Sequence, residues 1–151
     1  MAHLIQTTVA LRPALIGRSS AELLTVTTQV APSGALVLAV RGEVDSSTCP
    51  LLRVRLIAQL RSTHHLVLDL GEVSFLSAAG LTVLVVVREA ALVAGTRLCV
   101  VARSRAVRLP LMITGLTGVI DLHLDVADAL LCSSLPAGPR LVDPRQPGDL
   151  R

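Results

Sequence analysis

The residues best placed for chemistry are an aspartate and a serine that follow apolar segments. Asp69 comes directly after the apolar residues 66–68, and Ser77 precedes a long apolar segment that begins at Ala78. A serine at the start of a helix can be a nucleophile, an anion ligand or the helix N-cap, because the first N–H groups of a helix have no partner within it. For Ser77, capping and a functional role are both open, and both can hold at once.

Sequence motifs of common catalytic centres are absent. The chain contains no G-x-S-x-G, no Walker loop, no G-x-G-x-x-G and no H-E-x-x-H. Asp69 resembles the acidic strand ends of phosphotransfer receivers, but a receiver also needs a late lysine, and this chain has no lysine. A serine nucleophile at Ser77 would need a nearby base. The candidates His64 and His65 precede the strand that leads to Ser77, so we expect them at the opposite end of the sheet and predict no enzyme and no catalytic residue.

Cysteines and histidines show no spacing typical of a metal site. Cys49, Cys99 and Cys132 are far apart, no C-x-x-C occurs, and His64 and His65 are adjacent. Adjacent side chains on an extended chain point in opposite directions. We therefore expect no metal and no cofactor, and we interpret the cysteines as free thiols in a reducing compartment, which favours the cytoplasm.

Charge and hydropathy exclude two classes of partner. The sequence pI is 9.3, but residues 21–133 carry nine arginines and nine acidic residues, so the basic excess lies in the two ends. A nucleic-acid site needs clustered positive charge, and we expect none. The start of the chain lacks the basic region of a secretory signal. The apolar stretch 81–94 is interrupted by Arg88 and Glu89, so we expect no membrane span.

Alternation of short apolar runs with amphipathic segments predicts an α/β fold. Strands are expected at residues 24–30, 35–40, 66–70, 96–102 and 119–124, and helices at 48–62, 78–94, 105–116 and 126–133. The turn residues 31–34 make the first two strands an edge hairpin. Strands alternating with helices then imply a single domain with a mixed, mostly parallel central sheet of about five strands and about four helices.

Composition divides the chain into three parts. We expect an N-terminal arm at residues 1–20, the folded domain at 21–133, and a disordered tail rich in proline and glycine at 134–151. Loops 42–47, 74–80 and 102–108 should then lie together near the carboxyl ends of the strands, where open α/β sheets bind ligands and partners. The third of these loops contributes arginines at positions 103, 105 and 108.

Two of these loops resemble the STAS domain of anti-sigma factor antagonists. The similar segments are G-E-V-D at 42–45, L-D-L at 68–70 and V-S-F-L-S-A-A-G-L at 73–81, with a weaker likeness in L-T-G at 116–118. The similarity covers about residues 22–133. It implies a STAS-like domain that is not an enzyme and that binds an anti-sigma factor of the serine-kinase type, which frees a sigma factor.

The resemblance also implies a partner-binding surface and a departure from the usual switch. The residues of this surface would be Gly42, Glu43, Asp45, Ser74, Ser77, Ala78, Ala79 and Gly80. The family pattern F-[LI]-D-S-[ST]-G-L, aligned on Phe75 and Gly80, puts Ser77 at the aspartate position and Ala78 at the phosphoacceptor position. Either the kinase cannot switch this protein off at that site, or Ser77 has become the phosphorylation target.

Other functions stay open on the sequence. A diverged STAS module could sense a nucleotide or another anion at the helix start next to Ser77. A chain that is 52% hydrophobic could also form a homodimer through exposed apolar surface.

Overall fold

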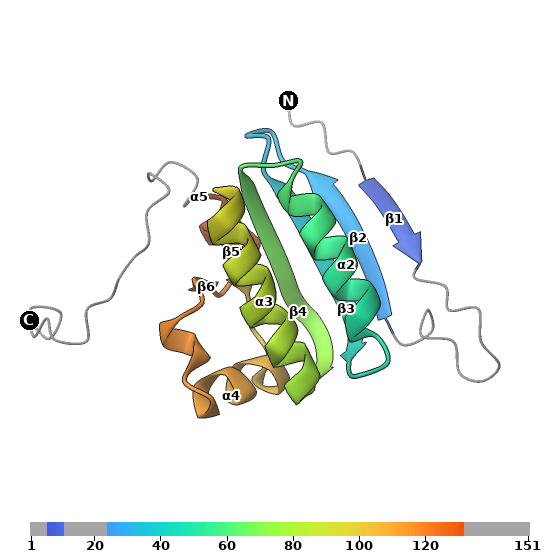
Figure 1. Ribbon diagram of the computed structural model, residues 1–151, viewed down its shortest axis with the longest axis vertical. Coiled ribbons are helices and arrows are strands. Elements are labelled where there is room, and N and C mark those ends of the chain that lie inside the picture. The colour runs from blue at the N-terminus through green and yellow to red at the C-terminus, as the bar shows by residue number, and fades with distance from the viewer. Residues whose placement is uncertain (1–5, 11–23, 132–151) are drawn as a thin grey trace, which may run out of the picture.

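Residues 6–10 and 24–131 are described by the computed structural model, and within them the strands form one six-stranded sheet in the order β1-β2-β3-β4-β5-β6 (Figure 1). The predicted hairpin is present, because β2 (Leu24–Val30) pairs antiparallel with β3 (Leu36–Val44). It does not form the edge of the sheet as predicted, since β1 lies outside β2. The turn between them closes with a hydrogen bond of 2.8 Å from the Ala31 N–H to the Ala35 carbonyl. Gly34 supplies the positive φ of 87° that this tight turn requires.

Three further strands run parallel to β3. They are β4 (His65–Leu76), β5 (Arg97–Val101) and β6 (Leu122–His123). The crossovers between them contain α2 (Cys49–Leu60), α3 (Ala78–Ala94) and α4 (Arg105–Ile113), the last followed by a 3-10 turn, η1 (Leu116–Gly118). The chain of described residues ends in α5 (Val126–Leu131). The predicted α/β class, with a mixed and mostly parallel sheet, is confirmed.

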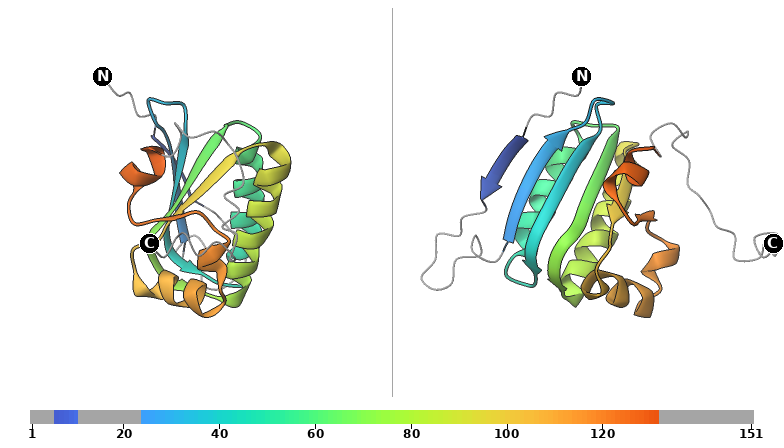
Figure 2. Two further views of the ribbon diagram at one scale, coloured as in Figure 1. Left: turned by 90° about the vertical axis from the view of Figure 1, so that its left-hand side faces the viewer. Right: turned by 180° about the vertical axis from the view of Figure 1, so that it is seen from behind.

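Helices lie on both faces of the sheet. Figure 2 shows α2 and α3 side by side on one face, α5 on the other and α4 at one end. The main core lies under α2 and α3, where Leu38, Leu56, Leu68 and Val87 are fully buried. A smaller cluster under α5 contains Val67, Cys99 and Ala129. The view from behind leaves much of β2, β3 and β4 uncovered by helices in the described part of the chain.

Strand β1 (Gln6–Ala10) was not expected. Within the segment predicted to be an N-terminal arm, these residues pair antiparallel with β2, from Gln6↔Gln29 to Ala10↔Thr25. The sheet therefore has one strand more than the five predicted. The rest of the predicted arm and the predicted tail at 134–151 lie outside the described residues.

Strand β4 is longer than predicted. We expected the strand to stop at Leu70, with a turn at Gly71 and Glu72, but β4 continues to Leu76. The pairing with β3 changes register twice, first between Ala39↔Asp69 and Arg41↔Glu72 and then between Gly42↔Val73 and Glu43↔Phe75. Each register change places an extra residue on β4, which is a β-bulge. The polar residues were mistaken for a turn because bulges interrupt the alternating pattern.

The two bulges keep β4 attached to the core. Leu66, Leu68 and Leu70 alternate toward the main core, as a regular strand requires. After the bulges the next core residues are Val73 and Leu76, each three positions on. The intervening Glu72, Ser74 and Phe75 are exposed, so the end of β4 presents its polar and aromatic side chains to solvent.

The helices agree with the sequence more closely than the last strand does. Helix α3 has the predicted bounds, and Gly95 ends it in a left-handed conformation with φ 71°. Helix α4 contains Pro110 and stops at Ile113, three residues early, and Gly115 with φ 75° starts the next turn. The last strand is only Leu122–His123. In the described residues, no helix is long and apolar enough to cross a membrane.

Gly80 allows α3 to pack closely on the ends of two strands. A Cβ atom at this position would lie 2.5 Å from Leu76 Cδ1 and 2.8 Å from Val44 Cγ1, and both of those side chains are buried. A methyl group there must push the helix or the core side chains apart. The position therefore selects glycine although glycine weakens helices.

We expect Gly80→Ala to lower the free energy of unfolding by about 1–3 kcal/mol, because overpacking outweighs the gain in helix propensity. The measurement is equilibrium denaturation in urea. Gly118→Ala is the matched control, since a Cβ at Gly118 would meet nothing within 4 Å. Equal stability of the two variants would contradict the close packing at Gly80.

Candidate functional site

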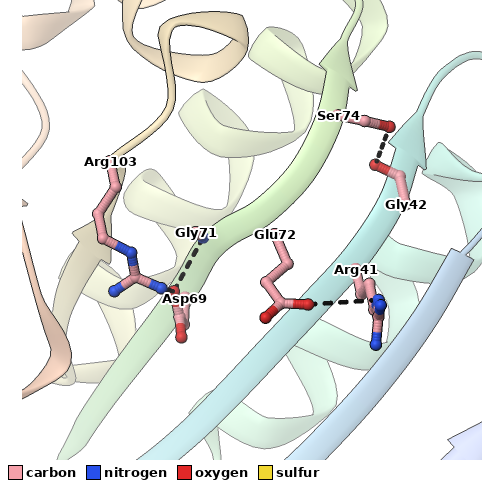
Figure 3. Close-up of polar contacts among 7 residues, drawn as sticks. All are labelled: Arg41, Gly42, Asp69, Gly71, Glu72, Ser74 and Arg103. Carbon is pink, nitrogen blue, oxygen red and sulfur yellow. Dashed lines mark hydrogen bonds and ion pairs between the residues drawn. The ribbon is translucent and has the colours of Figure 1, made fainter.

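The ends of β3 and β4 bring the predicted loops together. Ser74 Oγ donates a hydrogen bond of 3.2 Å to the Gly42 carbonyl (Figure 3), and Glu43 is paired with Phe75 in the sheet register. At the exit of β4, the Ser77 N–H donates to the Val44 carbonyl at 2.9 Å. Two segments about 30 residues apart in the sequence, 42–45 and 74–80, thus form one continuous surface.

The backbone conformation at position 42, where β3 pairs with β4, requires glycine. Its φ is 113°, a value that residues with a side chain rarely adopt. It lies at the second register change of the β3–β4 pairing. Glycine at position 42 therefore has a structural reason, which is separate from any contact with a partner.

Asp45 fastens the loop between β3 and α2. Its Oδ1 accepts hydrogen bonds from Ser47 Oγ at 2.7 Å, from the Ser47 N–H at 2.9 Å and from the Thr48 N–H at 3.1 Å. These donors, the Ser47 hydroxyl first, hold the pKa of Asp45 below its ordinary value. Thr48 Oγ1 in turn accepts from the Asp45 N–H at 3.0 Å. Asp45 thus shapes this surface as an ionised carboxylate.

Ser77 is the N-cap of α3. Its backbone is extended, with φ −81° and ψ 171°, and its Oγ accepts a hydrogen bond of 3.2 Å from the Gly80 N–H. The Leu81 N–H donates to the Ser77 carbonyl at 3.0 Å. The bond from Leu81 is the first regular bond of the helix. Of the amide groups at this helix start that have no partner within the helix, those of Ser77 and Gly80 are satisfied by Val44 and by the cap, which leaves fewer donors for an anion. The capping role predicted for Ser77 is confirmed.

Small and apolar side chains are exposed around this cap. Phe75 has 51% of its surface exposed although it is the only aromatic residue of the chain. Ala78, the first residue of α3, and Ser74 are exposed, whereas Ala79 is partly buried and Gly80 is buried. An exposed aromatic side chain beside an exposed helix start is typical of a surface that binds another protein.

The third loop touches β4 before this surface. Arg103 Nη2 lies 3.6 Å from Asp69 Oδ1, which also accepts a hydrogen bond of 2.9 Å from the Gly71 N–H (Figure 3). Asp69 thus accepts a hydrogen bond from a backbone amide at the first bulge and lies beside an arginine. This is a structural role, unlike that of the acidic strand ends of phosphotransfer receivers. Arg108 Nη1 donates a hydrogen bond of 3.3 Å to the Ala102 carbonyl. Of the three predicted arginines, Arg103 is the one shown in contact with β4.

Charges on the uncovered face are paired across the strands. Arg41 and Glu72 form an ion pair of 3.2 Å between neighbouring strands (Figure 3), and both side chains are more than 60% exposed. Such exposed pairs contribute roughly 0–1 kcal/mol. This pair helps to fix the register next to the bulge but is not a strong anchor.

A second cluster of reactive side chains was missed by the sequence analysis. Cys99, Asp121 and His123 each offer a ligand atom, and these atoms all lie within 4.8 Å of one another. The sequence spacing of the cysteines and histidines gave no sign of this cluster. The sequence shows that Asp121 and His123 are two positions apart, which places them on one face of a strand. It does not show that this strand pairs with the one that contains Cys99. Burial raises the pKa of the Cys99 thiol to about 12, so the thiol is neutral and a poor nucleophile.

Comparisons with known proteins agree with this fold. The sequence profile of the STAS domain matches residues 26–129. An anti-sigma factor antagonist from Mycobacterium paratuberculosis shares 35% identity, with a TM-score of 0.67 over 72% of this chain and 92% of that one. SpoIIAA of Bacillus in its phosphorylated form shares 13% identity, with a TM-score of 0.56 over 72% and 98% of the two chains. SpoIIAA in its unphosphorylated form shares 15% identity, with a TM-score of 0.55 over 64% of this chain and 84% of that one.

These matches define the class of protein. No protein with a curated description matches the chain at a significant level. The profile match covers more than half of the chain, and the mycobacterial antagonist is similar over most of both chains. The chain belongs to the STAS domain family.

We expect Ser77→Ala to lower the free energy of unfolding by about 1 kcal/mol, because the Gly80 N–H loses its acceptor. Ser77→Asp should keep the wild-type stability, since a carboxylate also caps a helix and is favoured near its N-terminus. Ser46→Ala, which changes an exposed neighbouring serine, is the control. Thermal unfolding measures all three, and an unchanged S77A midpoint would contradict the cap.

Replacement of Asp45 should have an effect that depends on pH. The pKa of Asp45 is lower in the folded chain than its ordinary value of 3.8, so its stabilising effect is complete above that value and is lost as the pH falls through the lower folded pKa. We expect Asp45→Asn to be less stable than wild type by about 1 kcal/mol at pH 7. As the pH falls below 3.8 and through the lower folded pKa, the two should converge. A constant difference from pH 7 down to pH of about 2 would contradict the role of the charge.

Proposed function

We propose that this chain is an anti-sigma factor antagonist, which binds an anti-sigma factor of the serine-kinase type and so frees a sigma factor. The observation that carries the proposal is the surface formed by residues 42–45 and 74–80, with Phe75 and Ala78 exposed beside the cap of α3. The 35% identity to a mycobacterial antagonist supports it. This function is regulatory and needs no catalytic residue, which fits the absence of catalytic motifs in the sequence.

Docking would place the residues of the site in different roles. Phe75, Ser74 and Ala78 are exposed and available for direct contact. Glu43 is partly exposed and adds negative charge at the rim. Asp45, Ser77 and Gly80 shape the surface from within through the contacts described above. Ala79 is partly exposed on the first turn of the helix.

The best test of docking changes contact without changing the fold. Phe75→Ala removes an exposed aromatic side chain, whereas a substitution at Asp45 would also release the loop that Asp45 fastens. The matched control is Val93→Ala, because Val93 is 91% exposed and lies near the opposite end of α3. Both variants should unfold like wild type.

We expect F75A to weaken binding to the anti-sigma factor about tenfold or more, as truncation of an aromatic hot spot does, and V93A to leave it unchanged. The partner is first recovered by cross-linking from native lysate and identified by mass spectrometry. The purified partner is then titrated by calorimetry. Equal affinities for wild type and F75A, or loss only in V93A, would mean that the partner does not dock at this surface.

We also propose that phosphorylation at the usual position does not switch this protein off. Phosphoserine adds nearly two negative charges, which an interface built for a neutral residue does not tolerate. SpoIIAA has been solved with and without phosphate, which supports phosphorylation as a change of state in that protein. Here the matching position is Ala78, which has no hydroxyl, and the hydroxyl of Ser77 accepts the cap hydrogen bond.

The purified anti-sigma factor and ATP test this proposal by mass spectrometry of the phosphorylated sites. Wild type should stay unmodified, whereas Ala78→Ser should gain one phosphate at the exposed first position of α3. Each is assayed beside S77A and A78S/S77A. Phosphate on Ser77 of the wild-type protein would overturn the proposal and identify Ser77 as the target.

A further inference from the structure

The other face of the sheet carries a group of thiol, imidazole and carboxylate side chains that the proposed function does not use. They lie on neighbouring parallel strands, and we call them the thiol–imidazole cluster: His65, Cys99, Asp121 and His123. His65 begins β4, Cys99 lies in β5, and His123 ends β6. Cys99 belongs to the small core under α5, so the cluster lies on the side away from α2 and α3.

The sheet register brings the cluster together. The hydrogen bond from the Val100 N–H to the Asp121 carbonyl is 2.9 Å, and that from the Ala102 N–H to the His123 carbonyl is 3.0 Å. Because side chains alternate along a strand, positions 121 and 123 point to the same face. This alternation places a carboxylate and an imidazole beside the thiol.

Several donor atoms of the cluster lie close to one another. Cys99 Sγ lies 3.4 Å from Asp121 Oδ2 and 3.3 Å from His65 Nε2. The Nε2 atom of His123 lies 3.1 Å from Asp121 Oδ1. Zinc bonds of about 2.3 Å to sulfur and about 2.0–2.1 Å to nitrogen or oxygen put tetrahedral ligand atoms about 3.3–3.6 Å apart. The ligand atoms of Cys99, Asp121 and His123 all lie within 4.8 Å of one another, so these three side chains must move closer together to seat an ion, and His65 is next to the thiol.

The donor types select the kind of cation. A thiolate and imidazoles favour zinc and similar borderline metals, whereas magnesium and calcium prefer sets of oxygen ligands. One thiolate and one carboxylate together balance the charge of a divalent ion. We propose that the thiol–imidazole cluster binds one zinc ion or a divalent cation with the same preferences.

The cluster is mostly buried but is open to solvent on one side. Cys99 is fully buried and His65 is 6% exposed, while the side chain of Asp121 is 33% exposed. An ion can thus enter past Asp121 and reach a thiol that bulk solvent does not. The Arg97 guanidinium lies 3.8 Å from Asp121 Oδ2. The same guanidinium also contacts the Cys99 thiol, so it must give up its contacts with both ligands when the ion binds, and its positive charge weakens the affinity for the cation.

A bound ion would fasten the edge of the sheet. Strand β6 is only two residues long, so few backbone hydrogen bonds hold it to β5. A metal bridging Cys99 to Asp121 and His123 adds a link between these strands. The site is also separate from the proposed docking surface, because His65 and Leu76 are the two ends of β4. Leu66–Leu76 pairs with the shorter Leu36–Val44, so these ends are roughly 30 Å apart at about 3.3 Å per residue of regular strand.

Cobalt(II) is the direct probe, because its spectrum reports both coordination number and thiolate ligation. The full chain without a histidine tag is stripped with a chelator, dialysed and titrated with cobalt chloride. We expect one equivalent to give the visible bands of tetrahedral cobalt and a thiolate charge-transfer band in the near ultraviolet, and zinc chloride to displace both. Zinc should also raise the thermal unfolding midpoint of the stripped protein.

Variants assign the ligands. Cys99→Ser should abolish the charge-transfer band, and Asp121→Asn and His123→Gln should each weaken zinc binding about tenfold or more. Cys49→Ser removes a buried thiol outside the cluster, and His64→Gln changes the exposed neighbour of His65; both should bind like wild type. Circular dichroism of each stripped variant checks the fold, and D121N decides the matter if C99S does not fold.

Two outcomes would overturn the proposal. One is a wild-type protein that gives no thiolate–cobalt band at one equivalent. The other is a band that persists in C99S and disappears in C49S or Cys132→Ser, which would place the metal on a different thiol.

Discussion

The candidate site depends on the parallel pairing of β3 with β4 and on the two extra residues that β4 carries in that pairing. Without the bulges, strict alternation from Leu70 would keep Leu76 on the core face but turn Val73 away from it. With them, both residues stay buried, and Phe75 is left exposed between them. The same geometry ends β4 beside Val44, so the Ser77 N–H can bond to that strand and α3 can start at once.

Local signals explain why the helix after this strand was predictable. Ser77 has an acceptor side chain at the N-cap, and Gly95 adopts the left-handed conformation at the other end. Both ends are decided within a few residues of sequence, and the bounds of α3 were predicted correctly. The continuation of β4 past Gly71 depends instead on β3 and on Asp69, whose carboxylate accepts from the Gly71 N–H. Strand β3 lies outside residues 66–76, so no pattern within that segment reveals the pairing.

The thiol–imidazole cluster was missed for a related reason. His65, Cys99 and Asp121 are separated by 34 and 22 positions, which no ligand-spacing motif covers. Their meeting depends on which residues of β4, β5 and β6 are paired, and a two-residue edge strand gives little sequence signal. The candidate docking surface was predictable because its two segments carry a local likeness to a family. The cluster carries no such likeness and emerges only from the register.

Residue 77 and residue 78 divide two tasks at the start of α3. The hydroxyl of Ser77 accepts a hydrogen bond from the Gly80 N–H and so stabilises the start of the helix. Ala78 faces outward and offers only a methyl group. Under the proposed function, this surface keeps its neutral character whatever the kinase does at position 78. Control of the antagonist would then have to act through its amount, its partner or its stability, and the last of these is where an ion at the opposite end of β4 would contribute.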